Sequence, residues 1–96
     1  SLNGLTMKEA ILLQLYATDP KRLNYMRLAH DLSDIGRKQI AAASVRARAS
    51  ELRRQDLIFT NHDGYRLTDR GIERVEKEIA PDLPDNVLNV FGEIPE

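Results

Sequence analysis

The pattern of apolar and polar positions predicts two helices in the first third of the chain. The first begins at the capping box Thr6-Met-Lys-Glu9, in which the Thr6 hydroxyl can accept from the third helical amide while Glu9 reaches back. Asp19-Pro20 ends it, because proline disfavours helix in the residue before it. Its apolar residues recur at helical spacing: Ala10, Ile11, Leu12, Leu15 and Tyr16.

The second predicted helix is short and runs from Tyr25 to Leu32, with Asn24 as its cap. Its core-facing residues are Leu28, Ala29 and Leu32. We expect Ser33-Asp-Ile-Gly36 to break it.

The third predicted helix is basic, begins between Arg37 and Ala43, and ends near Gln55. On a helical wheel, Val45, Ala49 and Leu52 share one narrow face that suits packing. The opposite face holds Ala43, Ala47, Ser50 and Arg54, with Arg46 and Arg53 along one edge and Ser44, Arg48 and Glu51 along the other. Small residues let a helix approach a surface closely, and the planar fork of arginine suits phosphates and guanine edges.

A β-hairpin and a fourth helix follow. Leu57-Ile-Phe-Thr60 and Tyr65-Arg-Leu-Thr68 are strand-like, and Asn61-His-Asp-Gly64 between them contains the Asp-Gly pair of a tight turn. Thr68 can cap the fourth helix, whose apolar stripe is Ile72, Val75 and Ile79. After Pro81 the chain is acidic and has no regular period, but it carries one apolar cluster, Val87-Leu-Asn-Val-Phe91, which we expect to dock on the first or fourth helix.

A chain of 96 residues suits one domain, and we divide it into an N-terminal extension or cloning remnant at 1–5, a folded domain at 6–80 and an acidic, Pro-containing tail at 81–96. The hydrophobic fraction of 42% and charged fraction of 30% exclude wholesale disorder. No apolar run reaches the roughly 20 residues of a membrane-spanning helix, and no signal peptide is recognisable, so the expected location is cytoplasmic. The absence of cysteine excludes disulfides and thiolate sites. The predicted fold class is mainly α with a small β-hairpin, an α+β domain.

The formal net charge of −1 hides a strong segregation along the chain. From Lys21 to Arg54, nine Lys or Arg residues stand against three acidic ones, a net charge of +6. From Glu73 to Glu96, two basic residues stand against seven acidic ones, a net charge of −5. A polyanion responds to the local field rather than to the sum, so the basic segment remains a candidate for binding nucleic acid.

The sequence holds little that suggests catalysis. His30 and Asp34 stand four apart, but two ligands without a third make a weak metal site. His62 lies in a turn with only Asp63 beside it, and Glu73 and Lys77 form an ordinary helix-surface pair. With no phosphate-binding glycine loop, triad order or paired-carboxylate motif, we expect neither an enzyme nor a cofactor or metal.

The order of three helices, hairpin and closing helix resembles a winged helix-turn-helix domain of the multiple-antibiotic-resistance type and related bacterial and archaeal regulators. Three phrases carry the resemblance over about residues 6 to 80: Leu28-Ala29, then Ser44-Val45 through Glu51-Leu52 to Leu57-Ile58, then Tyr65-Arg-Leu-Thr-Asp-Arg-Gly71. Two features differ from the family pattern. The stretch from Leu28 to Val45 is longer than the usual turn, leaving room for an extra helical turn within residues 33 to 41, and Asp56 stands where glycine is usual.

The resemblance implies a small transcriptional regulator whose third helix enters the major groove of duplex DNA. The base-contact candidates are Ser44, Arg46, Ala47 and Ser50, and the other candidate contacts, mainly to phosphates, are Arg37, Lys38, Arg53, Arg54, His62 and Arg66. Because the hairpin is short, minor-groove contact is not expected. A homodimer through the first helix, the fourth helix or the tail would suit such a regulator. The alternative is a winged helix that contacts or dimerises with protein and does not read DNA.

Overall fold

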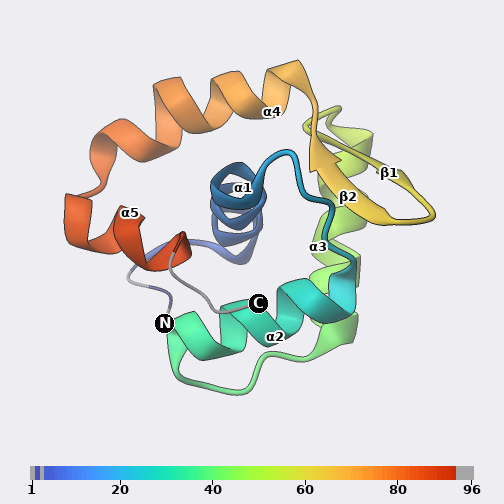
Figure 1. Ribbon diagram of the computed structural model, residues 1–96, viewed down its shortest axis with the longest axis horizontal. Helices are drawn as coiled ribbons and strands as arrows, with labels where there is room; N and C mark the ends of the chain where they lie inside the picture. The colour runs from blue at the N-terminus through green and yellow to red at the C-terminus, as the bar shows by residue number, and fades with distance from the viewer. Residues whose placement is uncertain (1, 3, 93–96) are drawn as a thin grey trace.

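The computed structural model describes Leu2 and residues 4–92, and its first helix, α1 (Met7–Thr18), forms the centre of the molecule (Figure 1). The capping box is confirmed: Glu9 N–H donates to Thr6 Oγ1 over 3.1 Å, and Thr6 N–H donates to Glu9 Oε1 over 2.9 Å. Six consecutive residues, Ala10 to Leu15, are buried. The other elements therefore surround α1, which explains why even Gln14 is inaccessible to solvent.

Helix α2 (Tyr25–Gly36) is one turn longer than the sequence pattern indicated. Asn24 caps it as predicted, accepting from Arg27 N–H over 2.8 Å. The expectation that Ser33-Asp-Ile-Gly36 breaks the helix was wrong, because the Ser33 hydroxyl donates to the Ala29 carbonyl over 2.6 Å and accepts from Ile40 N–H over 3.0 Å. This back-bonding keeps Ser33 compatible with helix, and the additional turn accounts for the length between Leu28 and Val45.

Helix α3 (Ala42–Arg54) begins within the predicted range of Arg37 to Ala43 and ends one residue before Gln55, where the sequence placed its end. Its C-terminus closes with Asp56 in the left-handed conformation, φ +61°, and with Leu57 N–H donating to the Leu52 carbonyl over 3.0 Å. These are features of the Schellman motif, which usually employs glycine at this position. Aspartate fulfils the same role because its short side chain tolerates the left-handed region better than most.

The predicted hairpin consists of β1 (Ile58–Asn61) and β2 (Gly64–Leu67), antiparallel, with Ile58 opposite Leu67 and Asn61 opposite Gly64. The sequence did not indicate a further pairing in which Leu23, between α1 and α2, forms a bridge with Tyr65. Gly64 allows this approach: its φ is +126°, and a Cβ there would lie 2.6 Å from the Leu23 carbonyl carbon. The hairpin is thereby tied to the α1–α2 connection.

Thr68 caps the fourth helix, as predicted. Its Oγ1 accepts a hydrogen bond from Gly71 N–H over 3.0 Å. The helix begins as α4 (Asp69–Arg74), widens into a π-helix, η1 (Val75–Ile79), and ends in a 3₁₀ turn, η2 (Ala80–Asp82). Val75 and Ile79 of the predicted stripe are buried, and Ile72 is half-buried.

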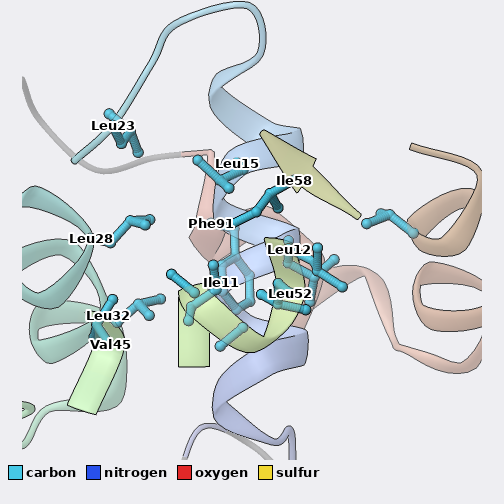
Figure 2. Packing of buried hydrophobic residues seen from close by; sticks show 14 of the residues in the cluster. Ile11, Leu12, Leu15, Leu23, Leu28, Leu32, Val45, Leu52, Ile58 and Phe91 are labelled. Carbon is cyan, nitrogen blue, oxygen red and sulfur yellow. The ribbon is translucent and has the colours of Figure 1, made fainter. Parts of the chain in front are cut away.

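The segment after Pro81 was expected to be irregular, and this was wrong for residues 85–91, which form the short helix α5 (Asp85–Phe91). The expected docking on α1 is observed. Phe91, 2% exposed, and Val87, 9% exposed, belong to the same core cluster as Ile11, Leu12 and Leu15 of α1 (Figure 2). Val87 and Phe91 form the buried face of α5, with Leu88 half-buried beside them, and a helix this short gains most of its stability from such packing.

The described residues therefore form a mainly helical α+β unit with one two-stranded sheet. The elements encircle α1, with α3 and the hairpin on one side and α5 on the other (Figure 1).

Gly71 packs so closely against the end of the third helix that replacing it by alanine should destabilise the protein. A Cβ at Gly71 would lie 2.0 Å from the Leu57 carbonyl oxygen, a backbone atom that cannot move alone. We expect Gly71→Ala to cost about 3 kcal/mol of unfolding free energy, the upper part of the range for overpacking. Gly92→Ala is the matched control, because nothing lies within 4 Å of its added Cβ. Denaturant titration followed by circular dichroism measures both, and equal midpoints would show that α4 does not abut Leu57.

Candidate nucleic-acid interface

The buried face of α3 is the one that the wheel predicted. Val45 and Ala49 have no exposed surface and Leu52 is 1% exposed. On the opposite side Ala43, Ala47 and Arg54 are exposed and Ser50 is half-buried. The exposed face of α3 is therefore free of bulky apolar side chains, and arginines flank it.

A polar groove of about 300 Å³ separates α3 from the hairpin. Arg46, Ser50 and Arg53 of α3 line one side of it. The remaining lining residues come from the start of α2 and from the hairpin: Asn24, Tyr25, Thr60, Asn61, His62, Gly64 and Tyr65. Its composition of two guanidinium groups, hydroxyls, amides and an imidazole suits an anion with several acceptor oxygens.

The guanidinium of Arg46 is held in place by an aromatic ring. Its Cζ lies 5.3 Å from the centre of the Tyr25 ring, within the range of a cation–π interaction. Tyr25 follows the Asn24 cap, so the start of α2 determines where the charge of Arg46 lies. Such stacking leaves the edge of the guanidinium fork available for hydrogen bonds.

Tyr65 is the second aromatic residue in the groove, and its phenol stays protonated at neutral pH. Burial raises the pKa of Tyr65, and the nearby positive charges of Arg46 and Arg53 lower it by a smaller amount. A neutral phenol can donate a hydrogen bond to an anion. The register of the hairpin and the bridge to Leu23 place it there.

The arginines of α3 differ in their ion pairing. Arg48 pairs with Glu51, which also lies 3.3 Å from Lys8 Nζ. Arg46, Arg53 and Arg54 have no carboxylate partner within Leu2 and residues 4–92. The positive charge on the hairpin side of α3 is therefore not neutralised within the described part of the chain.

The structure brings only some of the sequence-predicted residues together. Arg46, Ser50, Arg53 and His62 line the groove. Ser44 and Ala47 lie along the other edge of α3, in a shallow hollow beside Met7. Arg37 and Lys38 are exposed in the connection before α3, where Arg37 is in the left-handed conformation.

Arg66 lies outside this groove, because it belongs to the other face of the hairpin. Its Nε is 3.2 Å from Asp19 Oδ1, in an ion pair that links β2 to the end of α1. Sequence reasoning missed Tyr25, Tyr65 and Asn24 as lining residues. The Asn24 cap was visible in the sequence, but the Leu23–Tyr65 bridge that brings the start of α2 to the hairpin is a long-range contact, which no local pattern reveals.

Charge is segregated in space as well as in sequence. The exposed acidic residues Glu73, Glu76, Glu78, Asp82 and Asp85 lie along α4, η1, η2 and α5. This arc runs from the hairpin to the opposite side of α1 from α3 (Figure 1). A polyanion approaching α3 would meet the basic side of the molecule first.

Other titratable pairs are ordinary surface contacts. His30 Nε2 lies 3.6 Å from Asp34 Oδ2, His62 Nε2 lies 4.0 Å from Asp63 Oδ1, and Lys77 Nζ lies 3.3 Å from Glu73 Oε2. Within the part of the chain that the structure describes, no three histidine or acidic side chains gather in a metal-binding cluster. No helix there has the length and apolar character needed to cross a bilayer.

Comparison with known proteins gives no matching family model, no matching curated protein and no matching solved structure.

Arg46 lies on the surface and should matter little for stability. An exposed cation–π contact is worth about 0.5–1 kcal/mol, so Arg46→Ala should lower the free energy of unfolding by no more than about 1 kcal/mol. Denaturant titration measures the change. A loss of several kcal/mol would mean that Arg46 supports the core rather than the groove.

Proposed function

We propose that this chain is a winged helix-turn-helix domain that binds duplex DNA through α3, as a small transcriptional regulator. The observation that carries the proposal is the groove between α3 and the hairpin, in which Arg46 and Arg53 lie beside hydroxyl and amide groups. The order of elements, with α3 followed directly by a hairpin and then by α4, supports it.

In this arrangement the exposed face of α3 lies in the major groove. Ser44, Arg46, Ala47 and Ser50 are the proposed base contacts, since they occupy the N-terminal two-thirds of the exposed face. Arg53 and Arg54, in the last turn of α3, are the proposed phosphate contacts. The exposed Arg37 and Lys38, in the connection before α3, are proposed to contact the sugar-phosphate backbone of the DNA. Phosphate contacts position the protein, and base-edge contacts supply the sequence preference.

A second candidate function is contact with a protein partner in place of DNA. Of the four large hydrophobic side chains that are exposed in the described residues, Met26 of α2 at 64% and Phe59 of β1 at 40% are the most exposed. Aromatic residues and methionine are enriched in protein interfaces. A homodimer would also use such residues. The salt dependence of DNA binding separates the two functions.

The chain should bind duplex DNA at low salt with an affinity that falls steeply as salt rises, because neutralising phosphates releases counterions. We expect the logarithm of the affinity to fall with the logarithm of salt concentration with a slope of about −3 to −6, taking about −0.9 for each phosphate contacted. Fluorescence anisotropy of a labelled duplex, titrated at several salt concentrations, measures the slope. A flat response, or no binding at about 50 mM salt, would favour the protein-contact function.

Two arginine variants test the division of roles along α3. Arg46→Ala should cost about 1–3 kcal/mol of binding free energy on the preferred DNA sequence and reduce discrimination between sequences. Arg54→Ala should weaken binding to all duplexes by a similar factor. The preferred sequence comes from selection out of a random duplex library. Lys77→Ala is the matched control, because it removes an exposed positive charge from η1, on the acidic arc, and should leave DNA affinity unchanged. Equal losses of DNA affinity in all three variants would show that binding depends on the net charge of the protein and not on contacts made by α3.

A further inference from the structure

A mainly apolar hollow of about 460 Å³ lies between the C-terminal half of α1, the fourth helix and α5. Its volume is within the range of small-molecule sites, which are typically apolar clefts with a few polar groups at defined places. No charged residue lines it, and its walls are formed mainly by the apolar parts of Leu13, Tyr16, Val75, Leu88 and Phe91. The DNA-binding proposal uses none of these residues.

The fourth helix is irregular where it borders the hollow. Val75, a lining residue, is the first residue of the π-helix η1, and Ala80, which also lines the hollow, follows the last residue of η1. π-Helical turns are rare and frequently lie at functional sites. The position of η1 therefore supports a binding role for the hollow.

A carboxylate lies beside the hollow. The Tyr16 hydroxyl donates to Glu76 Oε2 over 2.7 Å, which places Glu76 one hydrogen bond away from a lining residue. This hydrogen bond and, to a smaller extent, burial raise the pKa of Tyr16, so the phenol remains a donor at neutral pH. Glu76 pairs with no lysine or arginine within Leu2 and residues 4–92. Because a carboxylate accepts several hydrogen bonds, Glu76 can accept from a further donor.

The α5 side of the hollow is also acidic. Asp85 is exposed and lies one helical turn before Asn89, a lining residue, and the sequence from 78 to 92 contains no lysine or arginine. An anion would meet like charge here, and so would a second copy of this chain placed symmetrically on the same surface. A molecule that combines an apolar body with a positive charge matches both the lining and its surroundings.

We propose that this hollow binds a small organic cation, in which an ammonium group is carried on a compact apolar body. The apolar body lies against Leu13, Val75 and Leu88, and the ammonium group donates to the Glu76 carboxylate. The hollow is bordered by the fourth helix and α5 and not by α3, so the proposal does not rest on DNA binding.

Chemical-shift mapping of the full chain with matched ligands tests the proposal. Phenethylamine, phenethyl alcohol and phenylpropionate share a phenyl body and differ in charge, and their naphthyl counterparts form a second series with a larger body. We expect at least one of the two amines to saturate with a dissociation constant near or below about 1 mM, with shifts at the backbone amides of Ala17, Ala80 and Leu88. The corresponding alcohol should bind about tenfold more weakly, and the carboxylate more weakly still.

Three results would overturn the proposal. Neither amine saturates, the shifts lie away from the hollow, or the carboxylate binds as tightly as the amine.

A charge-removing variant tests the contact with the ammonium group. Glu76→Gln keeps an acceptor for the Tyr16 hydroxyl, so it should weaken the amine about tenfold and leave the alcohol unchanged. Glu73→Gln is the matched control, because it makes the same exchange about one turn earlier, at an exposed residue that does not line the hollow, and it should bind the amine normally. Equal weakening by both exchanges would show that the amine responds only to net charge, and the proposal would be wrong.

A second variant tests the hollow itself. Ala17 lines the hollow and is exposed, so leucine at this position should fill part of the hollow without disturbing the core. Ala17→Leu should weaken both the amine and the alcohol at least about tenfold. Its thermal midpoint, followed by circular dichroism, should stay close to that of the unaltered chain. Unchanged amine affinity in Ala17→Leu would place the amine outside the hollow and overturn the proposal.

Discussion

The position of the hairpin relative to α3 depends on one backbone carbonyl, that of Leu57. It accepts from Thr68 N–H over 3.1 Å, and it lies where a side chain at residue 71 would begin. Thr68 Oγ1 also donates to the Asp56 carbonyl over 2.7 Å, so the residue that caps α4 binds two of the three residues between α3 and β1. The end of α3, the base of the hairpin and the start of α4 are thus joined over a few ångströms. The same junction helps to position the hairpin, which forms one wall of the proposed DNA-contacting groove.

Much of the local structure could be predicted because it depends on neighbours in sequence. The capping box at Thr6, the Thr68 cap and the buried stripe of Val45, Ala49 and Leu52 are short-range features, and the structure contains all of them. The length between Leu28 and Val45 left room for an extra helical turn, but its attachment to the end of α2 could not be predicted, because Ile40 N–H reaches Ser33 from seven residues away. Helix α5 was missed for a similar reason, since its apolar residues form a helix only against α1.

In the candidate site, too, the short-range features could be predicted from the sequence and the long-range contacts could not. The wheel identified the arginines of α3 and their edge of the helix, but it could not show what lies opposite them. Tyr25 beneath Arg46 and Tyr65 beside it come from the start of α2 and from β2, far apart in sequence. The neutral Tyr65 phenol gives the groove a donor that no charge count would include. Placing basic and acidic surfaces on opposite sides of α1 also lets a chain with a net charge of −1 present a positive face.

The bridge between Leu23 and Tyr65 has a consequence for motion. Tyr65 N–H donates to the Leu23 carbonyl over 2.8 Å, and Leu23 N–H donates back over 3.3 Å, so the hairpin is paired along the edge nearest α2. A hairpin that moves freely must be immobilised when it binds a partner, and that ordering opposes association. Here two backbone hydrogen bonds, and the ion pair between Arg66 and Asp19, hold the hairpin against the α1–α2 connection. A partner that binds in the groove would therefore meet a hairpin that is already held by the rest of the fold, and these contacts reduce the conformational entropy that binding would cost.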